Sequence, residues 1–187
     1  MKLAKLKLRI MSNEIMTLTY LNEDDKAYGL AGMAISLAAL DAIDRVAAVS
    51  LDADGPMVTF SHQYYFSGSP SVSPKVTWDT LLHNFYITSA MVISNVMARS
   101  IVRLGQEVPA DLLDTIHKEI AEEGRDTCSL EDDEIDTLYD KTRSYMGRIF
   151  RNPRLHPAID DFARTLSRRR SLSGSEIIDE LRALSII

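Results

Sequence analysis

The sequence predicts a mainly α-helical fold, with about six helices arranged around one buried central helix, and three observations support this prediction. Residues 74–104 carry apolar side chains on nearly every face, which is typical of a helix enclosed by other helices. Elsewhere, apolar residues recur at intervals of three and four, the spacing of one helix face. Prolines and capping residues divide the chain into segments of helix length. A chain of 187 residues suits one domain, so we expect a single globular unit over residues 1–187.

The central segment is better suited to a protein core than to a lipid bilayer. Three polar residues, His83, Asn84 and Asn95, interrupt it, and Arg99 follows them. These residues leave the run short of the roughly 20 apolar residues that span a membrane. We therefore expect a soluble protein without membrane association.

Polar residues at loose helical spacing along this segment could mark a wetter side of the helix or the floor of a pocket. Buried polar groups need hydrogen-bond partners, so a strip of core polar groups that satisfy one another is favoured over a ligand site. The residues are Asn84, Thr88, Asn95, Arg99 and Arg103.

The N-terminal residues follow a different pattern, in which apolar and polar side chains alternate. Alternation covers residues 5–10, and a second alternation covers residues 15–21. A period of two predicts strands, so residues 1–21 are expected to form a small β-hairpin or a partly ordered leader. A third strand is expected at residues 57–60, after a turn. Met11 could itself be the start of the chain, which would make the basic leader an annotation artefact.

Proline, glycine and capping residues predict where the helices begin and end. Acidic residues 23–25 suit the positive end of a helix, which is expected to run over residues 26–51. Gly29 and Gly32 would let a neighbouring helix approach it closely. Ser73-Pro74 suits the start of the central helix. The other expected helices run from Pro109 to Gly124, from a Ser129–Asp132 capping box to Asn152, from Pro157 onward, and from a Ser173–Glu176 capping box onward.

Charge is strongly segregated along the chain, although the net charge is only −6. Residues 107–140 carry 13 acidic and 2 basic side chains, whereas residues 141–170 carry 9 basic and 2 acidic side chains. The two blocks could neutralise each other, within the fold or across a homo-oligomer, or the basic block could bind an external polyanion. The single cysteine, Cys128, permits no intrachain disulfide and suits the reducing cytoplasm.

Carboxylates three or four residues apart on two successive helices are the best catalytic candidates. Two such helix faces could together hold Mg²⁺, which takes oxygen ligands and leaves room for phosphate. The spacing is similar to that of the all-α nucleotide pyrophosphohydrolases, and this resemblance implies a Mg-dependent phosphohydrolase. A solvated acidic face that pairs with the basic block explains the same pattern and is favoured. The candidate residues are Glu119, Glu122, Glu123, Asp133 and Asp136.

Three smaller motifs lack parts that their chemistry needs, so we expect no bound metal and no cofactor. Asp114 and His117 have the spacing of half a di-iron site, but no second acid–histidine pair follows. The Asp-x-Asp-Gly motif at residues 52–55 lacks the further oxygen ligands of a calcium loop. Cys128 lies between acidic stretches that would raise its thiol pKa, which favours an inert residue at a helix start.

Arginines of the basic block are the best candidates for a binding surface. The planar guanidinium group donates paired hydrogen bonds to phosphate, so a nucleic-acid-associated protein is one hypothesis. The chain is acidic overall, however, and dedicated nucleic-acid domains are usually basic. A surface cluster of arginines that forms ion pairs with the acidic block is therefore favoured. The candidate residues are Arg148, Arg151, Arg154, Arg168, Arg169 and Arg170.

Three functional hypotheses follow from these patterns. The first is a non-catalytic protein-interaction or self-associating module, which explains the segregated charge and the incomplete catalytic motifs. The second is the Mg-dependent phosphohydrolase, and the third is the nucleic-acid-associated protein. The sequence does not decide whether the protein is an enzyme, but it favours the first hypothesis. The expected partner is then another protein or a second copy of the chain.

Overall fold

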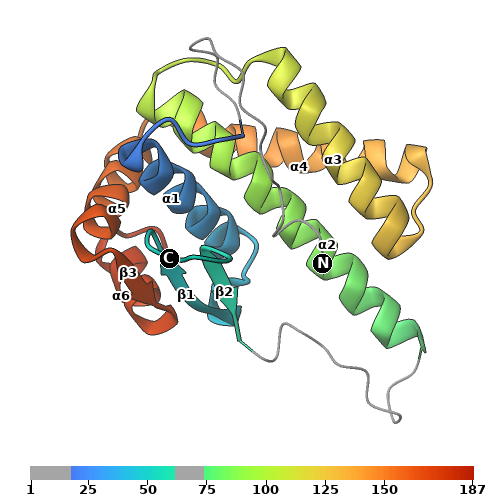
Figure 1. Cartoon of the computed structure of the whole chain (residues 1–187), viewed down its shortest axis with the longest axis horizontal. Helices are drawn as coiled ribbons and strands as arrows, with labels where there is room; N and C mark the ends of the chain where they lie inside the picture. The colour runs from blue at the N-terminus through green and yellow to red at the C-terminus, as the bar shows by residue number, and fades with distance from the viewer. Residues whose placement is uncertain (1–17, 62–73) are drawn as a thin grey trace.

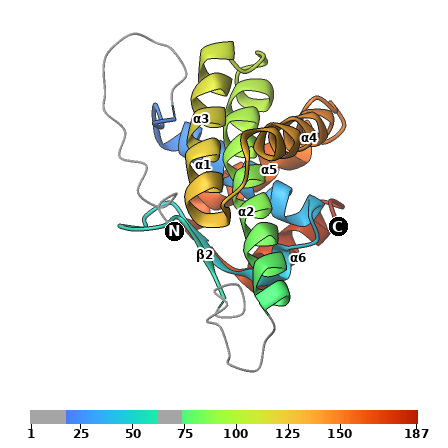
Figure 2. The same ribbon diagram turned by 90° about the vertical axis from the view of Figure 1, so that its right-hand side faces the viewer.

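A computed structural model describes residues 18–61 and 74–187 of the chain (Figure 1). Over these residues the fold is mainly helical, with six α-helices and a small antiparallel sheet of three strands, which confirms the predicted fold class. The helix that begins at Pro74 contacts three other helices. The sheet lies beside the two C-terminal helices (Figures 1 and 2).

The first helix, α1 (Glu23–Ala39), ends twelve residues earlier than the sequence predicts. The side chain of Asn22 accepts a hydrogen bond of 2.8 Å from the backbone N–H of Asp25, which caps the helix start. Asp41 adopts a left-handed backbone conformation with φ of 53°, which stops the helix. A short 3₁₀ turn, η2 (Ile43–Arg45), then leads into a strand. The predicted helix over residues 26–51 is therefore wrong in its second half.

The sheet has the strand order β2-β1-β3, and both pairings are antiparallel. The expected strand at residues 57–60 is confirmed as β2 (Val58–Phe60), which pairs with β1 (Val46–Ser50). Strand β3 (Ser171–Ser173) brings a C-terminal segment back beside β1. The hairpin predicted for residues 1–21 lies largely outside the described residues, and residues 18–21, which are described, form no strand.

Helix α2 (Pro74–Met97) begins at Pro74 as predicted and continues as a π-helical segment, η3 (Ala98–Arg103). It contacts α1 and the two helices that follow it in the chain. By length and composition alone the segment Lys75–Arg103 could cross a membrane, with a mean hydropathy of 1.3, but 78% of its most apolar window is buried inside the fold. Its apolar side chains are therefore largely used in packing against the rest of the chain.

The first turns of α2 do not share this burial. Trp78 and Leu81 are 39% and 40% exposed, and Val76 is 52% exposed. We call the continuous helix formed by α2 and η3 the α2–η3 rod. From Phe85 to Ile101, by contrast, most side chains of this rod are buried. The expectation that this helix is enclosed along its whole length is therefore wrong for its N-terminal end, where Val76, Trp78 and Leu81 are partly exposed.

The four remaining helices follow the predicted order, with two corrected ends. Gly124 does not end its helix, which continues to Cys128. The glycine serves packing instead, because Phe85 and Ile135 each lie within 3.3 Å of where a Cβ would be. Ser129, with φ of 49°, ends this helix instead. The next helix is capped by Glu131 with Glu134 rather than by Ser129, whereas the Ser173–Glu176 capping box is confirmed. The helices are α3 (Ala110–Cys128), α4 (Asp132–Phe150), α5 (His156–Arg169) and α6 (Gly174–Ala183).

Charged and polar side chains are buried where the start of α1 meets the end of the α2–η3 rod. Asp25 and Arg99 both have fully buried side chains, and the guanidinium donates to both carboxylate oxygens at 3.0 and 2.6 Å. Arg99 also donates to the carbonyl oxygen of Thr19 at 2.8 Å and lies 4.9 Å from the ring centroid of Tyr20. Asn95 donates to the Tyr20 hydroxyl at 2.8 Å. These contacts confirm, for this end of the helix, the expectation of core polar groups that satisfy one another.

Close contact between α1 and α2 depends on glycine, as the sequence predicts. A Cβ on Gly32 would overlap the carbonyl oxygen of Ser94 and would lie 2.7 Å from the Cβ of Ala98. We expect Gly32→Ala to lower the free energy of unfolding by about 1–3 kcal/mol in urea titrations, because the two helices must separate to admit the methyl group.

The matched control for this substitution is Gly55→Ala in the β1–β2 turn, where no atom lies within 4 Å of an added Cβ. Its effect should stay within about 0.5 kcal/mol of wild type. Equal stability of the two variants would contradict the close packing of α1 on α2.

Candidate functional site

The acidic residues predicted from spacing lie on α3 and α4, which pack against each other (Figures 1 and 2). Two of them are already engaged with uncharged or weakly basic neighbours: Asp136 lies 2.8 Å from a ring nitrogen of His117, and Glu123 accepts a hydrogen bond of 3.0 Å from Thr127. Among residues 18–61 and 74–187, no three His, Cys, Asp or Glu side chains are grouped so as to hold a metal ion. The candidates Glu119, Glu122, Glu123, Asp133 and Asp136 thus form no metal-ligand cluster with one another.

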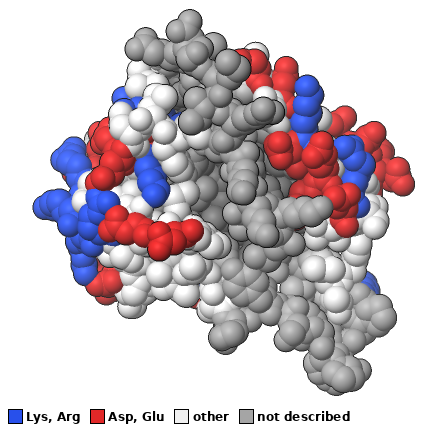
Figure 3. Space-filling view, viewed as in Figure 1, with Lys and Arg blue, Asp and Glu red and all other residues white. Residues whose placement is uncertain are grey.

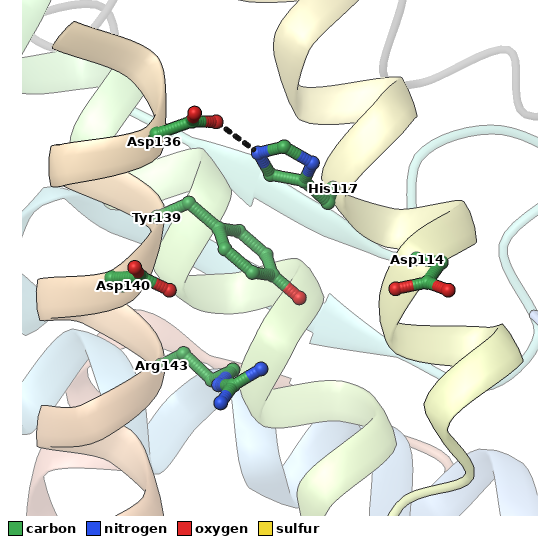
Figure 4. A pocket seen from close by; sticks show the side chains of 6 residues that line it. All are labelled: Asp114, His117, Asp136, Tyr139, Asp140 and Arg143. Carbon is green, nitrogen blue, oxygen red and sulfur yellow. Dashed lines mark hydrogen bonds and ion pairs between the residues drawn. The ribbon is translucent and has the colours of Figure 1, made fainter. Parts of the chain in front are cut away.

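A shallow hollow of about 230 Å³ opens between α3 and α4 (Figure 4). Within it, Nε2 of His117 lies 2.8 Å from Oδ1 of Asp136, so this pair bridges the two helices. The His117 ring also packs against Tyr139, with 4.6 Å between ring centroids. The hollow is smaller than the roughly 300–1,000 Å³ of most small-molecule sites. Its lining residues are Asp114, His117, Asp136, Tyr139, Asp140 and Arg143.

Tyr139 forms the buried floor of this hollow. Its hydroxyl donates a hydrogen bond of 3.0 Å to the carbonyl oxygen of Leu113, so it is satisfied by the adjacent helix. Burial raises the pKa of Tyr139, and the nearby Arg143 guanidinium opposes that rise. The six lining residues include no serine, threonine or cysteine that His117 could activate as a nucleophile. With three aspartates against one arginine, the hollow is predominantly acidic.

The sequence singles out three of the six residues that line this hollow. Asp114 and His117 have a suggestive spacing on one helix and Asp136 is a carboxylate candidate, and the structure places all three at the hollow. Asp140 and Arg143 come from α4, one and two turns beyond Asp136. The spacing of Asp136, Asp140 and Arg143, four and then three residues, places them on one face of α4. The sequence does not predict that this face meets α3, because tertiary packing decides it.

The predicted basic residues of α4 and of the following loop make separate contacts. Arg148 stacks over the ring of Tyr145 at 5.6 Å from the ring centroid. Arg151 makes a paired contact with Glu107, at 2.9 and 2.7 Å. Arg154 is exposed in the loop before α5. No contact shared by these three arginines is described.

The arginine run at the end of α5 is largely occupied by acidic side chains from elsewhere in the fold. Arg170 donates to Asp52, with 3.0 Å between Nε and Oδ2, and also pairs with Glu23. Arg169 pairs with Glu176 at the start of α6. Arg168 donates to the Thr165 hydroxyl at 3.2 Å. The run therefore ties α5 to α1, to the β1–β2 turn and to α6.

Few ion pairs join the acidic and basic blocks in the part of the chain that the structure describes. Between described residues, one ion pair joins them, that of Arg151 with Glu107. Asp132 pairs with Arg125 and Asp136 with His117, so three of the 13 acidic side chains in residues 107–140 have a described basic partner. We call the other ten carboxylates of residues 107–140 the acidic surface, which lies on α3, on α4 and at the residue that caps α4, and Figure 3 shows acidic side chains gathered at this end of the molecule. Its members are Asp111, Asp114, Glu119, Glu122, Glu123, Asp126, Glu131, Asp133, Glu134 and Asp140.

The exposed turns of α2 adjoin the acidic surface. The Cys128 thiol at the end of α3 lies 3.9 Å from the carbonyl oxygen of Leu81. Glu123 lies close enough to the same thiol to contribute to the rise in its pKa. Trp78 lies one turn before Leu81 on the helix. An apolar patch therefore borders the carboxylates, and sequence reasoning missed it because it expected the whole helix to be buried.

No protein-family model matches this chain, and no curated protein matches it. Its function must therefore be inferred from its own residues. The feature that stands out in the described structure is the excess of carboxylates on α3 and α4 beside the exposed turns of α2.

Cys128 lies at the end of α3, not at a helix start as the sequence suggested, and it is fully buried. Burial raises the pKa of its thiol, and the carboxylate of Glu123 raises it further. We expect this thiol to resist modification by a disulfide reagent at neutral pH in the native protein and to react at once in denaturant. Rapid, complete labelling of the native protein would contradict this placement.

Proposed function

We propose that this chain is a protein-interaction module and that the acidic surface of α3 and α4 binds a basic protein partner. The observation that supports this proposal best is the imbalance of ion pairs: three of the 13 carboxylates in residues 107–140 have a described basic partner. The proposal places the protein in the cytoplasm, where its single thiol would stay reduced.

Physical chemistry favours a cationic partner for such a surface. Carboxylates three or four residues apart on one helix repel each other and cost folding free energy. A basic partner replaces this repulsion with attraction and is steered toward the surface before contact. The effect weakens as salt screens exposed charges, so binding should depend strongly on ionic strength.

The two other hypotheses have less support from the described residues. A Mg-dependent phosphohydrolase would need carboxylates grouped around one ion, and residues 18–61 and 74–187 hold no such group. A nucleic-acid surface would need free arginines, but Arg169 and Arg170 are paired with carboxylates of the same chain. A second copy of the chain is a more plausible competitor, because basic side chains gather at the α5–α6 end in Figure 3.

The proposal is tested by the binding of an unstructured peptide rich in lysine, glycine and serine, measured by fluorescence anisotropy at low salt. Neutralising Glu119, Glu122 and Asp126 together, as Gln, Gln and Asn, should weaken binding about tenfold, since each exposed pair contributes roughly 0.5 kcal/mol. Raising the salt concentration should reduce the difference in peptide affinity between this variant and the wild type.

A matched control removes the same charge elsewhere, through Asn in place of Asp41, Asp44 and Asp54, which are exposed and lie outside the acidic surface. This control should bind the peptide as wild type does. Equal weakening in both variants would show that net charge alone attracts the peptide and would overturn the proposed surface. Sedimentation of the protein alone separates the competing case, because self-association would appear as a mass above that of one chain.

A further inference from the structure

Exposed apolar side chains concentrate at one place in the described structure. Of the six large apolar side chains that are most exposed there, three lie in the first turns of α2: Val76, Trp78 and Leu81. The other three, Leu21, Leu104 and Ile187, lie on separate segments. Clustering of apolar groups on a surface marks contact sites more often than scattered single residues do.

The spacing of these side chains selects the kind of partner. Trp78 and Leu81 are three residues apart, so they project from the same side of α2 and form a short apolar ridge. Exposed Asp79 lies between them in sequence, and the acidic surface begins at the neighbouring end of α3. A complementary partner must therefore offer apolar groups and, beside them, positive charge.

Helices α2 and α3 also restrict the backbone of the partner. Apart from the groups at the helix ends, their main-chain N–H and C=O groups are used within the helices, so an extended peptide finds no sheet edge there with which to pair. Binding has to be through side chains. An amphipathic helix presents apolar side chains in one stripe and basic side chains beside it, as this surface requires.

We infer that the partner docks as a basic amphipathic helix, with its apolar stripe on Trp78 and Leu81 and its basic residues along the acidic surface. This inference rests on the proposed function and adds the chemical and structural class of the partner. Charge complementarity commits it to a protein rather than a cell membrane, because the carboxylates of α3 would repel the anionic headgroups of a cytoplasmic leaflet.

Two synthetic peptides of about 18 residues test this inference, with the same numbers of leucine and lysine. In the first, leucines recur at helical spacing to form one stripe, and in the second the leucines are distributed around the helix. Trp78 is the only tryptophan of the chain, so its fluorescence emission reports contact at the ridge. The striped peptide should bind roughly tenfold more tightly and should shift the Trp78 emission to shorter wavelength, because it buries the indole.

Leu81→Asn removes the apolar contact without touching the acidic surface, and it should reduce binding of the striped peptide about tenfold. The control is Leu104→Asn, which changes a side chain of equal exposure at the far end of the same rod and should leave binding unchanged. Equal binding of the two peptides, or no effect of Leu81→Asn, would overturn the amphipathic-helix inference.

These outcomes are distinguishable from failure of the proposed function. If both peptides bind equally and neutralisation of Glu119, Glu122 and Asp126 weakens the binding of both, the proposed acidic surface is supported and the role of the apolar ridge is refuted. If neither peptide binds at low salt, the proposed function itself fails.

Discussion

The buried pair of Asp25 and Arg99 joins the beginning of α1 to the end of the α2–η3 rod, and the rest of the fold depends on that junction. Removing two charges from water costs several kcal/mol for each ion, so the pair persists only if its remaining donors and acceptors are satisfied. Here the backbone carbonyl of Thr19, the hydrogen bond of Leu21 N–H to the carboxylate and the guanidinium of Arg103 complete the set. The junction holds α2 in the position from which it contacts α3 and α4, and thereby positions the acidic surface.

Local signals predicted much of this fold, because the interactions that start and stop helices are themselves local. Pro74 and the Ser173–Glu176 capping box begin helices as expected. The sequence predicts a helix where strand β1 lies, because its short apolar run continues the spacing of α1 and only pairing with β2 and β3 makes it a strand. Strand β3 has three residues, too few to show a period.

The candidate site was predictable only in part. Segregation of charge is visible along the sequence, but the partners of each charge are decided by tertiary structure. Arg170 pairs with Glu23, 147 residues away, and with Asp52, so the sequence position of a basic side chain after the acidic block does not reveal which carboxylate it meets. The exposure of Trp78 was hidden for a related reason. An apolar residue on an apolar helix predicts burial, and only the three-dimensional structure shows that Trp78 is partly exposed.

The central claim, that the junction of α1 with the α2–η3 rod is held by the buried pair, is tested most directly by a double-mutant cycle. Unfolding free energies would be measured in urea for Asp25→Leu, Arg99→Met and the double variant. Each single variant should lose about 3–5 kcal/mol, because it leaves one buried charge unpaired, and the double variant should lose far less than the sum. The exposed pair of Arg125 with Asp132 is the comparison, where loss of one partner should cost less than about 1 kcal/mol. Additive losses, or single losses no larger than at this exposed pair, would contradict the claim.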